Sequence, residues 1–238
     1  MKKISIITIA YNNLSGLKRT VESVYLQTAF DKIEYIIIDG ASSDGTVEYL
    51  KSLPHSIIWI SEPDRGISHA FNKGIERSSG EMILCLNSGD IFADNTVVEK
   101  VMNDMEDLEA DIFSYKVKVT ESVFIPSTDD EGKIWNGCEE PHQGTFVRRR
   151  VYDEIGGYSE EYKIRMDYHF FARCKKNNYS FKYYPDIIVE YEPGGTSMAI
   201  ENRRRFWREG MSVKMMYDIA PTIKDFCKAI IYSRNKDI

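Results

Sequence analysis

The sequence of 238 residues lacks the signatures of several protein classes. Its four cysteines show neither a paired spacing nor a zinc-ligand pattern, which favours a reduced, cytoplasmic protein. No apolar run reaches the length of a transmembrane helix. Although Met1-Lys2-Lys3 precedes an apolar run, that run ends at Ala10 without a cleavage site, so it is interpreted as a first strand rather than a signal peptide.

Two phosphate-binding patterns are absent as well. The turn after the first expected strand reads Ala10-Tyr11-Asn12-Asn13, which is not the Gly-x-Gly-x-x-Gly of a dinucleotide site, and no Gly-Lys-Ser/Thr loop occurs. A bound nucleotide would therefore depend on side chains and a metal ion. The same turn lacks the Gly-rich, basic loop expected of a nucleotidyltransferase that makes sugar nucleotides, which argues against that class.

Net charge is −6, which argues against non-specific binding of nucleic acid. The charge is unevenly placed, because residues 200–238 hold nine basic and five acidic side chains, whereas 22 basic and 32 acidic ones precede them. An acidic body therefore carries a basic tail. Two interpretations stay open: a solvated helix face, or a tail that rests on an anionic membrane.

Strand-like and helical segments alternate through the first ninety residues. Apolar, β-branched runs predict strands over 4–10, 34–39, 57–61 and 81–87. Helical spacing of apolar residues predicts helices over 14–28 and 46–53, a third from Ile67 that ends at Ser78-Ser79-Gly80, and a fourth over 97–108. Such alternation predicts an α/β fold, a Rossmann-like and mostly parallel sheet with helices on both faces.

The second half is less regular. We expect strands over 111–120, 143–148 and 182–192, helices over 149–155, 166–177, 201–217 and 222–233, and a polar hairpin or loop over 122–137 that covers the site. No internal repeat or linker separates two domains. The expected organisation is one domain over 1–199, with a basic, helical C-terminal tail over 200–238 packed on it.

Three acidic residues follow expected strands: Asp39, Asp64 and Asp90. In open α/β sheets, ligands bind at the carboxyl ends of the strands. Asp90 is the best candidate ligand for Mg²⁺ or Mn²⁺, because these ions need only one or two protein carboxylates beside phosphate oxygens. The plainer alternatives are an Asx turn or a helix cap for Asp39, a turn residue for Asp64, and for Asp90 the cap of a turn before the helix that starts near Asp94. Lys73 and Arg65 are candidate diphosphate contacts.

Two further residues have the chemistry of a site. His142 lies in Pro141-His142-Gln143-Gly144, where it could bind metal, hydrogen-bond a substrate or be structural. Asp167 opens an expected helix, where it is either a cap or a general base aimed at an acceptor hydroxyl. His169 would point away from Asp167 on a helix and is interpreted as structural.

Taken in order, these segments resemble the family-2 glycosyltransferases with the GT-A fold over roughly residues 3 to 198. The resemblance rests on an ordered series and on no single motif. The series comprises Ile6-Ile7-Thr8-Ile9-Ala10-Tyr11-Asn12-Asn13, Ile37-Ile38-Asp39-Gly40-Ala41-Ser42-Ser43-Asp44-Gly45-Thr46, Ser61-Glu62-Pro63-Asp64-Arg65-Gly66-Ile67, Leu86-Asn87-Ser88-Gly89-Asp90, Pro141-His142-Gln143-Gly144 and Asp167-Tyr168. It is most similar to the transferases that build bacterial exopolysaccharide, capsule or O-antigen.

The resemblance implies an inverting, metal-dependent transfer of a sugar from a nucleotide donor, usually a UDP-sugar, to a glycan or lipid-linked acceptor. It implies Asp167 as the catalytic base and Asp90 as the ligand of Mn²⁺ or Mg²⁺, with His142 as a second candidate ligand. The residues that it implies for the nucleotide-sugar are Thr8, Ala10, Tyr11, Asp39, Asp64, Lys73, Asn87 and Gly89.

The sequence departs from the family pattern in two places. The acidic signature keeps one carboxylate, Asp90, and the base motif Met166-Asp167 lacks the preceding acid. The expected protein is a cytoplasmic glycosyltransferase, peripheral at the inner face of the plasma membrane if its tail binds lipid. The alternative is a non-catalytic nucleotide-sugar or glycan-binding module of the same fold.

Overall fold

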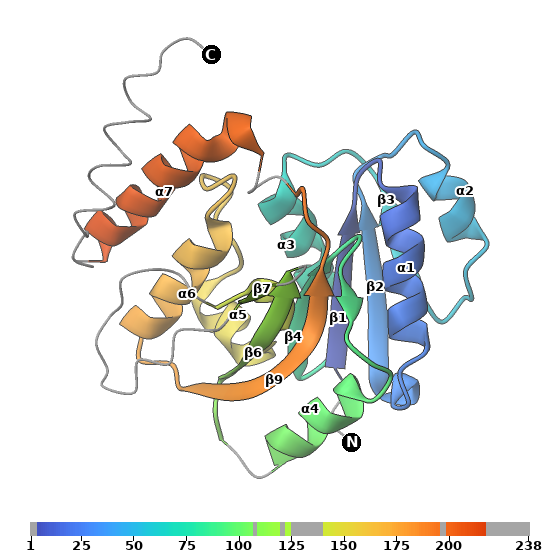
Figure 1. Ribbon diagram of the computed structural model, residues 1–238, viewed down its shortest axis with the longest axis horizontal. Coiled ribbons are helices and arrows are strands. Elements are labelled where there is room, and N and C mark those ends of the chain that lie inside the picture. The colour runs from blue at the N-terminus through green and yellow to red at the C-terminus, as the bar shows by residue number, and fades with distance from the viewer. Residues whose placement is uncertain (1–3, 107–108, 120–121, 125–139, 196–198, 218–238) are drawn as a thin grey trace.

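The computed structural model describes residues 4–106, 109–119, 122–124, 140–195 and 199–217 (Figure 1). Within these ranges the chain forms one nine-stranded mixed sheet flanked by helices. Its strands are β1 (Ile4–Ala10), β2 (Ile33–Asp39), β3 (Ile58–Ser61), β4 (Met82–Asn87), β5 (Ile91–Phe92), β6 (Ile112–Val119), β7 (Ser122–Phe124), β8 (Thr145–Arg148) and β9 (Phe181–Tyr191). Its α-helices are α1 (Leu14–Tyr25), α2 (Thr46–Lys51), α3 (Ile67–Arg77), α4 (Val97–Glu106), α5 (Arg149–Ile155), α6 (Met166–Lys176) and α7 (Arg203–Met216).

The four strands of the first half are parallel and lie in the order β3-β2-β1-β4, which confirms the predicted alternation. β1 lies between β2 and β4, because the chain first adds β2 and β3 on one side of it and then places β4 on the other. This reversal of direction opens a crevice between the carboxyl ends of β1 and β4. The strand register puts Ala10 beside Asp39 and Ile9 beside Asn87 at that edge.

Two apolar clusters, one on each face, bury the sheet. Alternate residues of β1 belong to different clusters: Ile6 packs with Leu17 and Val21 of α1, and Ile7 packs with Phe71 of α3. Helix α4 joins the first cluster, whereas α5, α6 and α7 join the second. The molecule is therefore a three-layer α/β/α structure, as Figure 1 shows.

The second half extends the sheet with mixed pairing. β8 is antiparallel to both β4 and β6, and β6 is parallel to β9. β9 in turn pairs with the two-residue strand β5, which the sequence does not predict because the pair is too short to show a period. This arrangement brings the end of β9 and the loop after it back to the carboxyl end of β4.

Several predicted boundaries differ from the structure. α1 ends at Tyr25 instead of residue 28, and the strand predicted over 143–148 begins only at Thr145. Before it, His142–Gly144 forms a short 3₁₀ helix, closed by a hydrogen bond from the N–H of Gly144 to the carbonyl of Pro141. The helix predicted over 222–233 lies outside the described residues, as does most of the loop predicted over 122–137.

Helix α7 packs on the body of the domain rather than standing apart from it. Figure 1 shows it beside α6, and its Val213 is fully buried in the cluster that α6 shares. Glu209, Gly210 and Lys214 are also buried on this face. Among the described helices, none combines the length and apolarity that crossing a bilayer requires.

The packing of α3 on β1 depends on the missing side chain of Gly74. A Cβ atom there would lie 2.3 Å from Cγ2 of Ile7, a branched side chain fixed in the core. Replacing Gly74 with alanine should therefore lower the free energy of unfolding by about 1–3 kcal/mol. For a chain of this size the melting temperature should fall by about 2–4 °C per kcal/mol, measurable by circular dichroism. Glu76→Ala, at an exposed position of the same helix, is the matched control; equal melting temperatures for the two variants would contradict this packing.

Candidate functional site

A cavity of about 1090 Å³ opens at the carboxyl ends of β1 and β4. One wall is the N-terminal end of α3, and another is the start of α6 together with Phe206 of α7. The loop after β9, from Glu192 to Gly195, closes the cavity beside β4. The switch point between β1 and β4 predicts a ligand site at this edge, and the cavity lies there.

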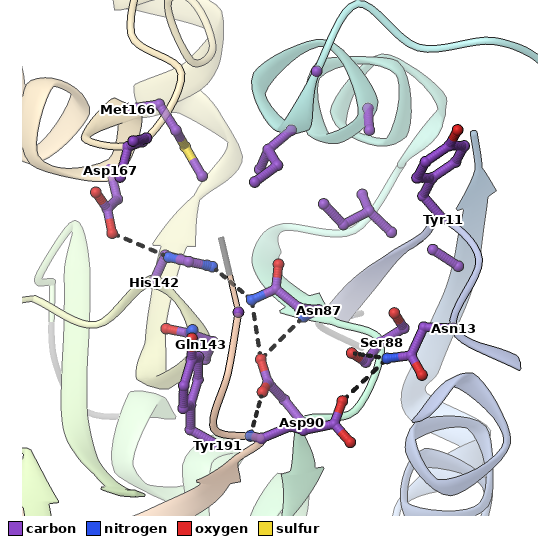
Figure 2. Close-up of a pocket in the computed structure, with 18 of the residues that line it drawn as sticks. Tyr11, Asn13, Asn87, Ser88, Asp90, His142, Gln143, Met166, Asp167 and Tyr191 are labelled. Carbon is purple, nitrogen blue, oxygen red and sulfur yellow. Dashed lines mark hydrogen bonds and ion pairs between the residues drawn. The ribbon is translucent and has the colours of Figure 1, made fainter. Parts of the chain in front are cut away.

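Four side chains form a continuous hydrogen-bonded series across the cavity, Asp90–Asn87–His142–Asp167 (Figure 2). Nδ2 of Asn87 lies 3.0 Å from Oδ2 of Asp90 and 3.2 Å from Nε2 of His142. Nδ1 of His142 lies 3.2 Å from Oδ2 of Asp167. All four residues line the cavity, so the predicted metal ligand and the predicted base share one site.

Asp90 is a buried carboxylate that accepts several hydrogen bonds. Its Oδ2 accepts from the backbone and side chain of Asn87, and its Oδ1 accepts from the N–H of Glu192 at 3.0 Å. Within the described residues, no lysine or arginine pairs with it. Burial raises the pKa of Asp90 to about 6, because these hydrogen bonds offset only part of the lost solvation.

The orientation of Asn87 decides which nitrogen of His142 carries a hydrogen. Since the ionised carboxylate of Asp90 can only accept, Nδ2 of Asn87 must face it, and the second hydrogen of Nδ2 then points to Nε2 of His142. Nε2 is therefore the acceptor, and Nδ1 donates to Asp167. This assignment follows from the hydrogen-bond network as a whole.

Asp167 lies in the first turn of α6, with its side chain 23% exposed to the cavity. Oδ1 accepts from the N–H of Tyr168 at 2.7 Å, and Oδ2 accepts from His142. Burial alone would raise the pKa of Asp167, but the hydrogen bond from His142 and the positive charge of Arg165 hold it below its ordinary value. Asp167 is thus ionised at neutral pH, which is the form that a general base needs.

The loop after β9 reaches the end of β4 through Glu192. Its side chain accepts from Nδ2 of Asn13 at 3.0 Å and pairs with Arg19. Gly89 has a φ of +106°, and a Cβ atom there would lie 1.9 Å from Oε2 of Glu192. Because Gly89 has no side chain, Glu192 can approach its backbone this closely. Gly89 itself does not line the cavity.

The end of the cavity beside Tyr11 combines an exposed aromatic ring with an ion-paired carboxylate. Tyr11 is 68% exposed and flanks Gly40, which Asp64 contacts from another side. Asp64 is paired with Nζ of Lys73 at 2.6 Å and lies 3.3 Å from Nδ1 of His69. In Figure 2, Tyr11 lies on the side of the site away from Asp167.

Of the predicted site residues, seven line the cavity and four do not. Those lining it are Ala10, Tyr11, Asp64, Asn87, Asp90, His142 and Asp167. Thr8 is buried and lies 3.1 Å from the hydroxyl of Tyr35, and Asp39 is buried and accepts hydrogen bonds from Ser42 and Ser61. Lys73 lies behind Asp64, and Gly89 lies against Glu192.

The structure also brings in residues that sequence reasoning did not select. Asn13, Glu192, Arg165 and Phe206 all line the cavity. Asn13 belongs to the Ala10-Tyr11-Asn12-Asn13 turn, and Arg165 lies two residues before the candidate base, so both were visible in the sequence without a predicted role. Glu192 and Phe206 stand in no recognisable motif, because each reaches the site through contacts between distant segments.

The oxygen and nitrogen ligands that the cavity offers suit a divalent metal ion that is held mainly by the substrate. Across the described part of the chain, no three His, Cys, Asp or Glu residues gather as a metal cluster. Both ring nitrogens of His142 already have partners, whereas Asp90 is a carboxylate of the cavity that forms no ion pair with a lysine or arginine of the described residues. One carboxylate fits Mg²⁺ or Mn²⁺ when diphosphate oxygens and water complete the shell.

Comparison with protein sequences finds close relatives. Residues 5–177 match the family model described as "Glycosyl transferase family 2". The chain is 34% identical over 178 residues to the uncharacterized glycosyltransferase Rv1514c of Mycobacterium tuberculosis, covering 72% of this chain and 68% of that relative. It is 26% identical over 227 residues to the PGL/p-HBAD biosynthesis glycosyltransferase Rv2957 of the same species, covering 89% and 85%.

Solved structures share the architecture. Residues 1–349 of S. aureus TarS in complex with UDP superpose with a TM-score of 0.71 at 14% identity, covering 98% of this chain and 71% of that chain. The mannosyltransferase PcManGT from Pyrobaculum calidifontis, in complex with GDP-Man and Mn²⁺, has a TM-score of 0.71 at 16% identity, covering 98% and 69%. This likeness shows the GT-A fold, as the sequence resemblance predicts.

Proposed function

This chain belongs to glycosyl transferase family 2, and we propose that it transfers a sugar, with inversion, from a UDP-sugar or a related nucleotide-sugar to an acceptor hydroxyl. One observation carries the proposal: a single cavity holds Asp90 and Asp167, joined through Asn87 and His142. The solved structures of similar fold support the donor class, since they are complexes with UDP, UDP-GlcNAc and GDP-Man.

We assign the nucleoside to the end of the cavity beside Tyr11. The exposed Tyr11 ring offers an apolar face to a base, and the carboxylate of Asp64 accepts hydrogen bonds from a ribose or a base. Lys73 holds Asp64 in place through their ion pair. Asp39, bound by Ser42 and Ser61, and Thr8, bound to Tyr35, support this end from behind the cavity wall.

We assign the diphosphate to the cavity near Asn87, Ser88 and Asp90, with Gly89 allowing the turn. Asp90 would hold Mn²⁺ or Mg²⁺, because its buried charge lacks a cationic partner among the described residues and its pKa is raised. When bound, such an ion stabilises the negative charge on the departing diphosphate. His142 is assigned to Asp167 instead, since both of its ring nitrogens are engaged.

Asp167 is the proposed base. As the acceptor oxygen forms its bond to the anomeric carbon, the bond from that carbon to the diphosphate oxygen breaks, and the hydroxyl proton passes to Asp167. His142 keeps the carboxylate ionised and oriented for this step. A base on the face of the sugar opposite the leaving group produces inversion.

We propose that the acceptor is a glycan or a lipid-linked hydroxyl used in cell-surface polysaccharide synthesis, at the cytoplasmic face of the membrane. The exposed face of α7 supports this location, with Arg203, Arg204, Arg205 and Arg208 near the exposed apolar residues Ile200, Met215 and Met216. The two cysteines that the structure describes, Cys85 and Cys174, are free and buried, as in a reducing compartment.

Metal-dependent donor binding tests the role of Asp90. Asp90→Asn keeps the shape of the side chain but removes its charge, so UDP affinity in the presence of Mn²⁺ should fall at least about 10-fold. Affinity without metal should change little, and calorimetry measures both. Asp94→Asn, an exposed position four residues away, is the control. Unchanged UDP affinity of Asp90→Asn with and without Mn²⁺ would refute the assignment.

Turnover tests the role of Asp167. Asp167→Asn should lower the rate of UDP release from a UDP-sugar by about 10²–10⁴-fold, because the amide cannot take the proton, whereas UDP affinity should be retained. Asp153→Asn, exposed on α5, is the control. Full turnover by Asp167→Asn would remove Asp167 from the mechanism. If the unaltered protein binds UDP but releases none from a panel of UDP- and GDP-sugars, the chain is a binding module.

Vesicle co-sedimentation tests the location. Binding to vesicles with anionic phospholipid at low salt should weaken by about 1 kcal/mol per charge when Arg203, Arg204 and Arg205 are replaced by glutamine. Replacing the exposed Lys51 and Lys182 by glutamine is the control for loss of positive charge elsewhere. Equal sedimentation with neutral and anionic vesicles would count against the proposal.

A further inference from the structure

Arg165 is a cation of the cavity that forms no ion pair with a carboxylate of the described residues. Among the described residues that line the cavity, two are arginines, Arg65 and Arg165. Arg65 is already paired with a carboxylate, because Glu160 accepts from its Nε at 2.8 Å and from its Nη2 at 2.6 Å. Arg165, by contrast, pairs with no carboxylate in the part of the chain that the structure describes, and its buried Nε has no hydrogen-bond partner there.

Aromatic rings hold the Arg165 guanidinium on two sides. Its central carbon lies 4.6 Å from the ring centre of Tyr168 and 4.4 Å from that of Phe206. Tyr168 belongs to α6 and Phe206 to α7, so the cation is clamped between two helices. Stacking of this kind stabilises the charge while leaving the N–H groups in the plane free to donate.

The backbone of Arg165 is fixed by Glu209, a buried residue of α7. Oε2 of Glu209 accepts from the N–H groups of Ile164 and Arg165, both at 2.9 Å, and Oε1 accepts from that of Lys163 at 3.1 Å. The carboxylate of Glu209 thus accepts from backbone donors and not from the guanidinium. Arg165 is consequently held in place before any ligand arrives, which lowers the entropy cost of binding.

An unpaired guanidinium in a partly desolvated cavity favours an anionic ligand. Arginine carries five donors in a planar fork that matches the oxygens of a phosphate or a carboxylate. The position of Arg165 favours contact with the acceptor substrate over the nucleotide-sugar, because Arg165 lies two residues before Asp167 and packs on Phe206. The proposed diphosphate position is at Asp90, on the other side of Asn87 and His142.

We propose that Arg165, clamped by Tyr168 and Phe206 and fixed by Glu209, binds an anionic oxygen group, a phosphate or a carboxylate, of the acceptor beside its reacting hydroxyl. The inference rests on the proposed glycosyl transfer and narrows its acceptor class. It also gives α7 a part in substrate binding, since both the ring of Phe206 and the carboxylate of Glu209 come from that helix.

A matched series of small probes tests the proposal. The full chain is saturated with UDP and Mn²⁺, so that the diphosphate position is filled, and is then titrated at low salt with glycerol phosphate, glycerate and glycerol. At least one anionic probe should bind more tightly than neutral glycerol. Arg165→Gln should weaken that anion about 10-fold or more, the range for a hydrogen bond to a charged group. Arg165→Lys should retain part of the binding, because the charge remains but the fork is lost.

The controls separate this proposal from the function on which it rests. Lys182→Gln removes an exposed positive charge outside the cavity and should leave the anion affinity unchanged. Melting temperatures show whether each variant is folded, and Arg165→Lys supplies the comparison if Arg165→Gln is not. Failure of the unaltered protein to bind both UDP and GDP would overturn the proposed function, whereas the proposal for Arg165 is judged on the protein loaded with the nucleotide that binds.

Three results would overturn the role of Arg165. In the first, the UDP-loaded protein does not distinguish the anionic probes from glycerol. In the second, Arg165→Gln binds them as the unaltered protein does. In the third, Arg165→Gln leaves the affinity for the probes unchanged but lowers the affinity for UDP, or lowers the affinity for UDP-glucuronate more than that for UDP-glucose. That result would place the arginine on the nucleotide-sugar instead.

Discussion

The side-chain amide of Asn87 is shared between two acceptors, and much of the site depends on this sharing. One hydrogen goes to the carboxylate of Asp90 and the other to the ring of His142. Because Asp90 also accepts from backbone N–H groups of Asn87 and Glu192, the carboxylate and not the ring sets the orientation of the amide. His142 must then donate from Nδ1 to Asp167. The negative charge of Asp90, just after β4, therefore determines that the Nδ1 hydrogen of His142 is the one donated to the candidate base, Asp167.

A second buried carboxylate, Glu209, organises the other side of the cavity. Three consecutive backbone N–H groups, from Lys163 to Arg165, end on it. These donors precede α6 and have no partner within that helix, so a side chain from elsewhere has to satisfy them. The C-terminal helix supplies it. α7 is thus part of the site. If its exposed face bound a membrane, α7 alone would lie between the membrane surface and the cavity.

Residues of similar chemistry have different positions in the fold. Asp39 and Asp64 both follow strands and both carry a carboxylate, yet Asp39 is buried among serine hydroxyls whereas Asp64 lines the cavity. Lys73 was predicted to contact a diphosphate, but its amine lies behind Asp64 in an ion pair. Local sequence identifies which side chains could bind a ligand. Which of them reach the ligand depends on packing around the strand ends.

The strands and helices of the first half could be predicted from the sequence, because apolar periodicity is a local property and each buried face leaves its own pattern. The α/β alternation predicted a mostly parallel sheet with ligands at the carboxyl ends of its strands. The strand order β3-β2-β1-β4, which brings Asn87 beside β1, came from the structure. Tertiary structure alone decided the partners: Glu192 meets Asp90, His142 meets Asp167, and Glu209 meets the segment before Asp167. A hydrogen bond between residues far apart in the chain leaves no periodic trace in either segment, so only the folded packing could assign it.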